Sequence, residues 1–185
     1  MTRDERIGAV LRASVPVFAS LGYRGASMAK IAAAAGMSRP ALYQYFRDRS
    51  DLFASAFRLL LEESTDAALS ALVVPGELAA QLDGFLQRLS GDAYEALASA
   101  PCGEELMDAK HEFASEAATA ALHRAHDGLR THLRDHASSS DDLDRAFELL
   151  TLAPAGLKQD HPSPAMYRSR LHFLAQTAAT TLLND

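Results

Sequence analysis

Hydrophobic and polar residues follow the spacing of amphipathic helices from one end of this chain to the other. Between residues 4 and 21, one apolar stripe at helical intervals is formed by Ile7, Val10, Leu11, Val17 and Phe18. Further along, large apolar side chains fall at i, i+4, i+7, i+8 and i+11: Leu78, Leu82, Phe85, Leu86 and Leu89. Alternating β-branched runs are absent, whereas alanine and leucine are abundant. The pattern therefore predicts an all-α fold.

Two short helices are expected near the N-terminus, where capping residues and a glycine follow each other closely. Ser27 and Ser38 can each cap a helix, because a serine hydroxyl accepts a hydrogen bond from an N–H group of the first turn. Gly36 separates the two helices, which we expect over residues 28–35 and 39–45.

The other helices are bounded by glycine, proline and polar residues. The first helix, residues 4–21, is expected to end at Gly22, and Pro16 should kink it. Ser50 is expected to cap a long helix that ends before Pro75. The remaining helices are expected near residues 78–89, 103–111, 113–136, from about 141, and 165–183. The sequence thus predicts about nine helices.

The charge distribution divides the chain in two. The protein has 185 residues, enough for one or two domains, and a net charge of −6. Residues 1–50 carry eight Lys/Arg and three Asp/Glu, whereas residues 51–185 carry ten Lys/Arg and 21 Asp/Glu. A basic head beside an acidic body indicates that the head meets a polyanion. We predict a DNA-binding domain at 1–48 and a second helical domain at 49–185.

Targeting signals are not apparent in the sequence. No apolar run approaches the roughly 18 residues of a membrane-spanning helix, and the N-terminus "MTRDERIGAV" has no apolar signal core. Cys102 is the single cysteine, which excludes an intrachain disulfide, and we interpret it as a small core residue. A cytoplasmic protein without membrane contact is expected.

Two short helices joined through a glycine are typical of a helix-turn-helix. A helix fits the major groove of DNA, and the residues near its N-terminus meet base edges. Arg39 can form a bidentate bond to guanine, Gln44 is a second polar reader, and the hydroxyls of Tyr43 and Tyr45 can reach phosphates. The buried side of the helix pair is expected to contain Ile31, Leu42 and Phe46, packed on Phe18 and Leu21.

Residues 6–53 resemble the DNA-binding domain of the tetracycline-repressor (TetR) family of bacterial transcription regulators. The stretch "VFASLGYRGASMAKIAAAAGMSRPALYQYFRDRSDLF" carries the resemblance through Phe18, Gly22, Tyr23, Ser27, Ile31, Ala32, Ala35, Gly36, Ser38, Leu42, Tyr43, Tyr45, Phe46 and Leu52, in order and spacing. Arg49 and Pro16 depart from the family pattern, which usually has a lysine at the position of Arg49.

The resemblance implies phosphate contacts by serine and tyrosine hydroxyls and a groove-facing segment from Arg39 to Gln44. The candidate DNA-binding residues are Ser27, Met28, Lys30, Ser38, Arg39, Pro40, Ala41, Tyr43, Gln44, Tyr45 and Arg49. It also implies a homodimer on a palindromic operator, most often a repressor, that a small-molecule effector releases.

The body of the chain should supply the dimer interface and the effector pocket. The last two long helices carry apolar stripes that can form a four-helix bundle with a second copy: Phe147, Leu150, Leu171, Leu174 and Ala178. The alternative is that both stripes pack inside one subunit. Candidate pocket residues for a mainly apolar effector are Phe57, Leu61, Phe85, Leu89, Tyr94, Met107, His111, Phe113 and Leu122, each of which can equally be ordinary core.

Some residues of the body are also compatible with other functions. Asp108, His111 and Glu112 share a helix face, as do two histidine pairs, so a metal-responsive regulator is one alternative. However, no Cys-x-x-Cys or His-Glu-x-x-His motif occurs, and we expect no metal and no cofactor. No nucleophile elbow or phosphate-binding glycine loop occurs either, so we do not expect an enzyme. A non-DNA-binding interaction protein of the same fold is the other alternative.

Overall fold

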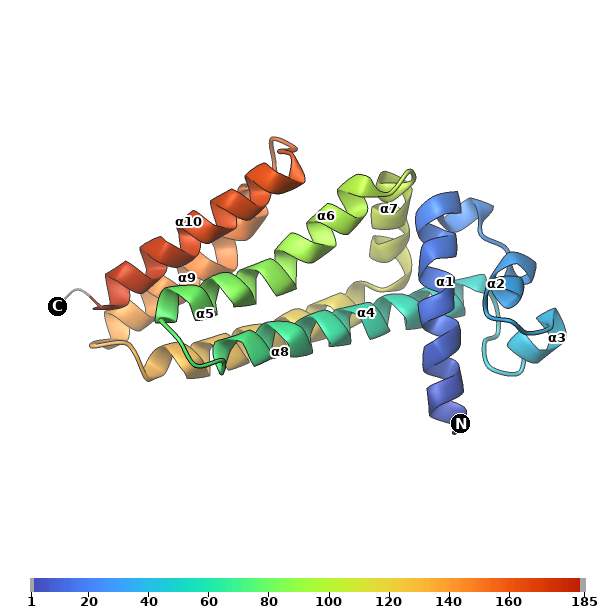
Figure 1. Cartoon of the computed structure of the whole chain (residues 1–185), viewed down its shortest axis with the longest axis horizontal. Coiled ribbons are helices and arrows are strands. Elements are labelled where there is room, and N and C mark those ends of the chain that lie inside the picture. The colour runs from blue at the N-terminus through green and yellow to red at the C-terminus, as the bar shows by residue number, and fades with distance from the viewer. Residues whose placement is uncertain (1, 184–185) are drawn as a thin grey trace. The chain divides into compact units, whose positions relative to one another are not determined.

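The fold is entirely helical over residues 2–183, which the computed structural model describes. The helices are α1 (Arg3–Gly25), α2 (Met28–Ala34), α3 (Arg39–Leu42), α4 (Arg49–Leu72), α5 (Leu78–Leu86), a π-helical turn η1 (Gln87–Gly91), α6 (Asp92–Ser99), α7 (Gly103–Phe113), α8 (Ser115–Arg134), α9 (Ser140–Gly156) and α10 (Pro164–Leu183) (Figure 1). Because α5, η1 and α6 follow each other without a break, the described residues form nine continuous helices. The all-α prediction is confirmed.

The chain forms two compact units, whose boundaries fall within α4, at the end of α6 and within α8. One unit comprises Met1–Glu62 and Ser99–Thr119, and the other comprises Glu63–Ala98 and Ala120–Asp185. The first unit thus contains α1, α2, α3 and α7 together with the beginnings of α4 and α8. The division by function at residue 48 that the sequence suggests stays a prediction.

The core of the first unit lies where α1 packs on α2 and α7. Ile31, Leu42, Phe46 and Phe18 are buried, as the sequence predicted. The expectation for Leu21 is wrong, because its side chain is 40% exposed. Burial of these large side chains provides most of the driving force that holds the short helices α2 and α3 in place.

Helix α1 changes direction at a glycine and not at its proline. Gly22 leaves helical geometry with φ 70° and ψ 173°, whereas Pro16 lies inside the helix and is not among its non-helical residues. The break therefore falls at Gly22 and not at Pro16, where we expected the kink. Proline has a φ angle that suits a helix and removes only one hydrogen bond, whereas the angles of Gly22 are almost exclusive to glycine.

Two predicted helix ends need correction. Helix α3 ends at Leu42 and continues as turns, so it is shorter than the expected 39–45. Ser50 does not cap α4, because it lies inside the first turn. Asp48 takes that role: its Oδ1 accepts hydrogen bonds from the Asp51 N–H (2.9 Å) and the Ser50 hydroxyl (2.6 Å). Aspartate and serine cap helices about equally well, so the cap is the residue that directly precedes the helix, which is Asp48.

In the second unit α10 packs against α5 and α9 around one hydrophobic core (Figure 1). Tyr167 is fully buried there, and its hydroxyl pairs with Ser90 Oγ (2.7 Å) and donates to the Pro154 carbonyl (3.1 Å). These bonds satisfy a polar group that would otherwise be costly to bury.

The residues expected at a dimer interface largely belong to this same core. The side chains of Leu150, Leu171, Leu174 and Ala178 are at most 7% exposed, and Phe147 packs against the cluster while half-buried. These side chains are thus covered within one chain, and the residues of the dimer interface stay a prediction. The large apolar side chains that the described parts of α9 and α10 leave exposed are Leu152, Met166, Phe173 and Leu183.

No helix within residues 2–183 combines the length and the apolar character that a transmembrane segment requires.

Candidate nucleic-acid interface

Helices α2 and α3 form a helix-turn-helix whose two N-termini are capped as predicted. Ser27 Oγ accepts a hydrogen bond from the Lys30 N–H, and Ser38 Oγ accepts one from the Ala41 N–H, each at 3.3 Å. Gly36 has a φ of +66° in the turn, a value that glycine adopts without strain. The caps and the glycine fix the direction in which α3 presents its side chains.

Most of the predicted DNA-binding residues lie on an exposed face of this helix pair. The exposed ones are Ser27, Lys30, Ser38, Arg39, Pro40, Tyr43 and Gln44, and the half-buried ones are Ala41, Tyr45 and Arg49. Met28 differs, because its side chain is only 6% exposed. Its side chain is therefore less accessible than those of the other candidates, and its role in DNA binding stays a prediction.

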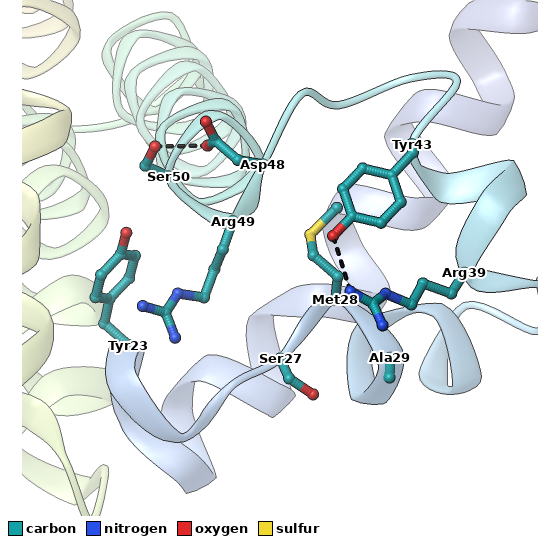
Figure 2. A pocket seen from close by; sticks show the side chains of 9 residues that line it. All are labelled: Tyr23, Ser27, Met28, Ala29, Arg39, Tyr43, Asp48, Arg49 and Ser50. Atoms are coloured by element: carbon teal, nitrogen blue, oxygen red, sulfur yellow. Dashed lines mark hydrogen bonds between the residues drawn. The ribbon is translucent and has the colours of Figure 1, made fainter.

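An open pocket of about 510 Å³ lies within the first unit on this face (Figure 2). It is lined by Tyr23, Ser27, Met28, Ala29, Arg39, Tyr43, Asp48, Arg49 and Ser50. Its polar atoms come from the α1–α2 linker, from α3 and from the start of α4, so separate short elements converge on one opening. Two arginines and the hydroxyls of serine and tyrosine suit an anion such as a phosphate group.

Arg39 and Tyr43 act as a pair on the exposed side of α3. The Arg39 Nη2 donates to the Tyr43 hydroxyl at 3.3 Å, and its guanidinium carbon lies 5.6 Å from the centre of that ring. The i, i+4 spacing brings the two side chains together on one helix face. Since the guanidinium has five N–H donors, several remain for a base edge or a phosphate.

Arg49 points the other way, toward the α1–α2 linker (Figure 2). Its Nη1 donates to the carbonyls of Arg24 (2.9 Å) and Ala26 (3.2 Å). Its guanidinium carbon lies 4.3 Å from the centre of the Tyr23 ring, within cation–π distance. Arg49 is predicted to bind DNA, but its side chain already has three partners within the protein.

Asp48 places a negative charge at the same opening. Hydrogen bonds from the Ser50 hydroxyl and the Asp51 N–H hold the pKa of Asp48 below its ordinary value of 3.8, so it is ionised at neutral pH. An anion in the pocket is therefore repelled on the Asp48 side and attracted on the Arg39 side, which favours approach next to α3.

Tyr45 lies at the other edge of α3, beside the first turn of α1. The Arg3 guanidinium carbon is 6.0 Å from the centre of its ring. Thr2 and Glu5 form a capping box that orders this turn. The arrangement leaves one positive charge next to a residue predicted to contact phosphate.

Tyr23 and Asp48 also line the pocket, although neither is among the site residues predicted from the sequence. A signal for Asp48 was present, because aspartate two residues before Ser50 is an equally good helix cap. For Tyr23 the sequence held no such signal, since only the fold brings its ring under the guanidinium of Arg49.

The predicted effector-pocket residues are divided between the two units. Phe57, Leu61, Met107, His111 and Phe113 belong to the first unit, and Phe85, Leu89, Tyr94 and Leu122 belong to the second. Within its unit, Phe85 is buried in the core, and the Tyr94 hydroxyl donates to the Pro162 carbonyl at 2.7 Å. His111 and Leu122 are exposed. The pocket itself stays a prediction.

The histidines do not assemble a metal centre in the described part of the chain. No group of three or more His, Cys, Asp or Glu side chains there is arranged to hold an ion. His132 instead pairs with Gln81 Oε1 at 3.0 Å and lies 4.9 Å, centre to centre, from the ring of His136. Burial, and then the neighbouring His136, lower the pKa of His132, as burial and His123 lower that of His126.

The fold and this surface define an all-helical protein with a helix-turn-helix head. A family model for bacterial regulatory proteins of the tetR family matches residues 10–56. This match confirms, over these residues, the resemblance to the TetR family seen in the sequence.

Curated relatives share only part of their length with this chain. The transcriptional activator FasR of Mycolicibacterium smegmatis is 36% identical over 72 residues, which cover 39% of this chain and 33% of FasR. The uncharacterized regulator YezE of Bacillus subtilis is 33% identical over 69 residues, or 37% of this chain and 36% of YezE. The match thus spans about a third of each relative.

Solved structures share the fold over nearly the whole chain. A tetR-family transcriptional regulator from Streptomyces coelicolor aligns with a TM-score of 0.62 and 23% identity, covering 100% of this chain and 85% of that one. The fatty acid degradation regulator FadR from Bacillus halodurans aligns with a TM-score of 0.61 and 17% identity, covering 95% and 96%. At these identities the likeness concerns the fold.

Proposed function

We propose that the protein is a transcriptional regulator that binds duplex DNA through α2 and α3 and has no enzymatic activity. One observation carries the proposal: two capped helices expose Arg39, Tyr43 and Gln44 on one face, beside a pocket lined by arginine and hydroxyl groups. A helix presented in this way fits the major groove.

The side chains divide into base readers and phosphate contacts. Arg39 and Gln44 can form hydrogen bonds to base edges, and each bidentate pair discriminates bases by about 1–3 kcal/mol. Phosphates are expected at Ser27, Ser38, Tyr43, Tyr45 and Lys30, which carry hydroxyl or ammonium groups and are exposed or half-buried. The Arg39–Tyr43 hydrogen bond would orient both side chains before DNA arrives.

Fluorescence anisotropy tests this function directly. The probe is a duplex that the wild-type protein enriches from a random-sequence library, with a scrambled duplex as control, between roughly 50 and 200 mM salt. Specific binding about a thousandfold tighter than to the scrambled duplex supports the proposal. Arg39→Ala should lower the binding free energy for the selected duplex by about 1–3 kcal/mol and weaken the preference for its sequence. Tyr43→Phe should weaken binding to both duplexes equally. Equal binding of the two duplexes by the wild type would refute a specific operator.

We further propose that the regulator acts as a homodimer in the cytoplasm, on an operator with two half-sites. The half-sites would lie about 34–36 Å apart or a multiple of that spacing. Since the core of the second unit takes up the residues first expected at the interface, exposed apolar residues of α9 and α10 are the better candidates, above all Leu152 (70% exposed) and Phe173 (74% exposed). Phe173→Glu should shift sedimentation equilibrium toward the monomer, and an unchanged dimer would exclude this face.

We propose repression, relieved by an apolar small molecule bound within residues 49–185. Such a ligand would favour a conformation with lower DNA affinity, and by linkage DNA would lower its affinity to the same extent. A reporter gene behind the selected duplex tests the sense of regulation: deletion of the regulator should raise expression. Lower expression after deletion would identify an activator.

A further inference from the structure

Arg49 lies at the start of α4, and its contacts tie this helix to the linker between α1 and α2. One nitrogen, Nη1, donates to two carbonyls, those of Arg24 and Ala26. Both carbonyls belong to the segment in which α1 ends, where the backbone lacks helical partners. The guanidinium therefore satisfies acceptors that would otherwise depend on water.

The aromatic face under this guanidinium is itself fixed by packing. The Tyr23 ring lies 5.0 Å from the Phe113 ring of α7 and 5.3 Å from the Phe53 ring of α4, centre to centre. Because Tyr23 is held by both helices, Arg49 stacks on a surface with little freedom to move. The three contacts together define the position of Ala26 and hence of Ser27, which caps α2.

We propose that Arg49 is a positioning residue for DNA binding: it clamps the α1–α2 linker onto α4 and so aims the capped N-terminus of α2, without itself binding a phosphate. This inference rests on the proposed DNA-binding function. Figure 2 shows the Arg49 side chain directed toward Tyr23 and away from Arg39 and Tyr43, which line the same pocket. Two of the carbonyls of the linker already accept hydrogen bonds from its Nη1.

Arg47 is a suitable control, because it is an arginine two positions earlier, in the bend that precedes α4. Its side chain is 86% exposed, and its ion pair with Asp51 has a long Nε–Oδ2 separation of 3.7 Å. Substitution of Arg47 therefore removes the same charge from the same neighbourhood without disturbing the linker.

Hydrogen exchange of the free protein tests the clamp independently of DNA. Lysine is a point charge that cannot reproduce a planar guanidinium stacked on a ring and bonded to two carbonyls. Arg49→Lys should speed exchange of the Ala26 and Lys30 amides about tenfold, the scale of one lost cation–π contact and hydrogen bond. Arg47→Lys should leave both amides unchanged. Wild-type exchange rates in Arg49→Lys would overturn the proposal.

Salt-dependent DNA binding distinguishes positioning from phosphate contact. The probe is the duplex selected by the wild-type protein, titrated with the Arg49→Gln and Arg47→Gln variants. Arg49→Gln should bind about tenfold more weakly, with a log–log salt slope that matches Arg47→Gln. A slope that falls below the Arg47→Gln value by about 0.9 per protomer would identify a lost phosphate contact and overturn the proposal. If the wild type selects no duplex, the proposed function fails, while the exchange rates still decide whether the clamp exists.

Discussion

Gly22 is the position where one added methyl group should cost the most. Its φ of 70° and ψ of 173° belong to a region that is almost exclusive to glycine. A Cβ atom there would lie 2.2 Å from Glu105 Oε2 and 3.2 Å from Cys102 Cβ. Glu105 is also occupied, because its Oε1 accepts a hydrogen bond of 2.6 Å from the Arg24 N–H. Gly22→Ala therefore combines backbone strain with displacement of a bonded carboxylate.

The expected loss in unfolding free energy is about 2–3 kcal/mol. Strain contributes about 1–3 kcal/mol, and the displaced hydrogen bond contributes about 1 kcal/mol. Alanine also lowers the conformational entropy of the unfolded chain, which offsets about 0.4–1 kcal/mol of this loss. Gly36→Ala should cost only about 1 kcal/mol, because its φ is also positive but nothing lies within 4 Å of the added Cβ. Gly25→Ala should be neutral or stabilising, since Gly25 is helical and its Cβ would meet Leu21 at an ordinary 3.4 Å.

Urea unfolding followed by far-ultraviolet circular dichroism measures all three variants. The double variant Gly22→Ala/Glu105→Ala separates the two causes, because it removes the clash and retains the strain. It should be less destabilised than the sum of its single variants. The reasoning is refuted if Gly22→Ala costs no more than Gly36→Ala, or if the two single effects simply add.

Three further predictions concern buried and titrating groups. Tyr167→Phe should destabilise the protein by about 1–3 kcal/mol, because Ser90 and a buried carbonyl lose their partner; Ser90→Ala in the same chain should add little, and full additivity would argue against a shared network. Asp48 has a lowered pKa, so its stabilisation is present above pH 3.8 and is lost as pH falls toward the folded pKa. In Asp48→Asn the unfolding free energy should therefore depend less on pH in that acidic range. An unchanged pH dependence in urea titrations would refute the role of Asp48 as the helix cap. His132 also has a lowered pKa, so the folded state binds fewer protons and stability should fall as pH drops below 6.5. His132→Gln should weaken this decline, and a decline equal to that of the wild type would assign it to other groups.

Local chemistry made the head predictable from its sequence. Ser27 and Ser38 cap their helices as expected, and Gly36 takes a positive φ in the turn. Such features depend on a few neighbouring residues, so local sequence determines them. The exposed position of Arg39 also followed, because the apolar residues of the helix pair mark its buried side.

Only the tertiary structure decided which partners each surface meets. The stripe that includes Leu150 and Leu171 was correctly read as apolar, yet the core of the same chain buries it and leaves Phe173 exposed. The sequence predicts that Arg49 binds DNA, but the fold places its guanidinium next to the Tyr23 ring and two carbonyls of the α1–α2 linker. Hydrophobic periodicity indicates that one face of a helix is buried, and a charged residue indicates that its side chain needs a polar or charged partner. Neither signal identifies the residues that make the contact, because contacts between residues far apart in sequence depend on how the helices pack.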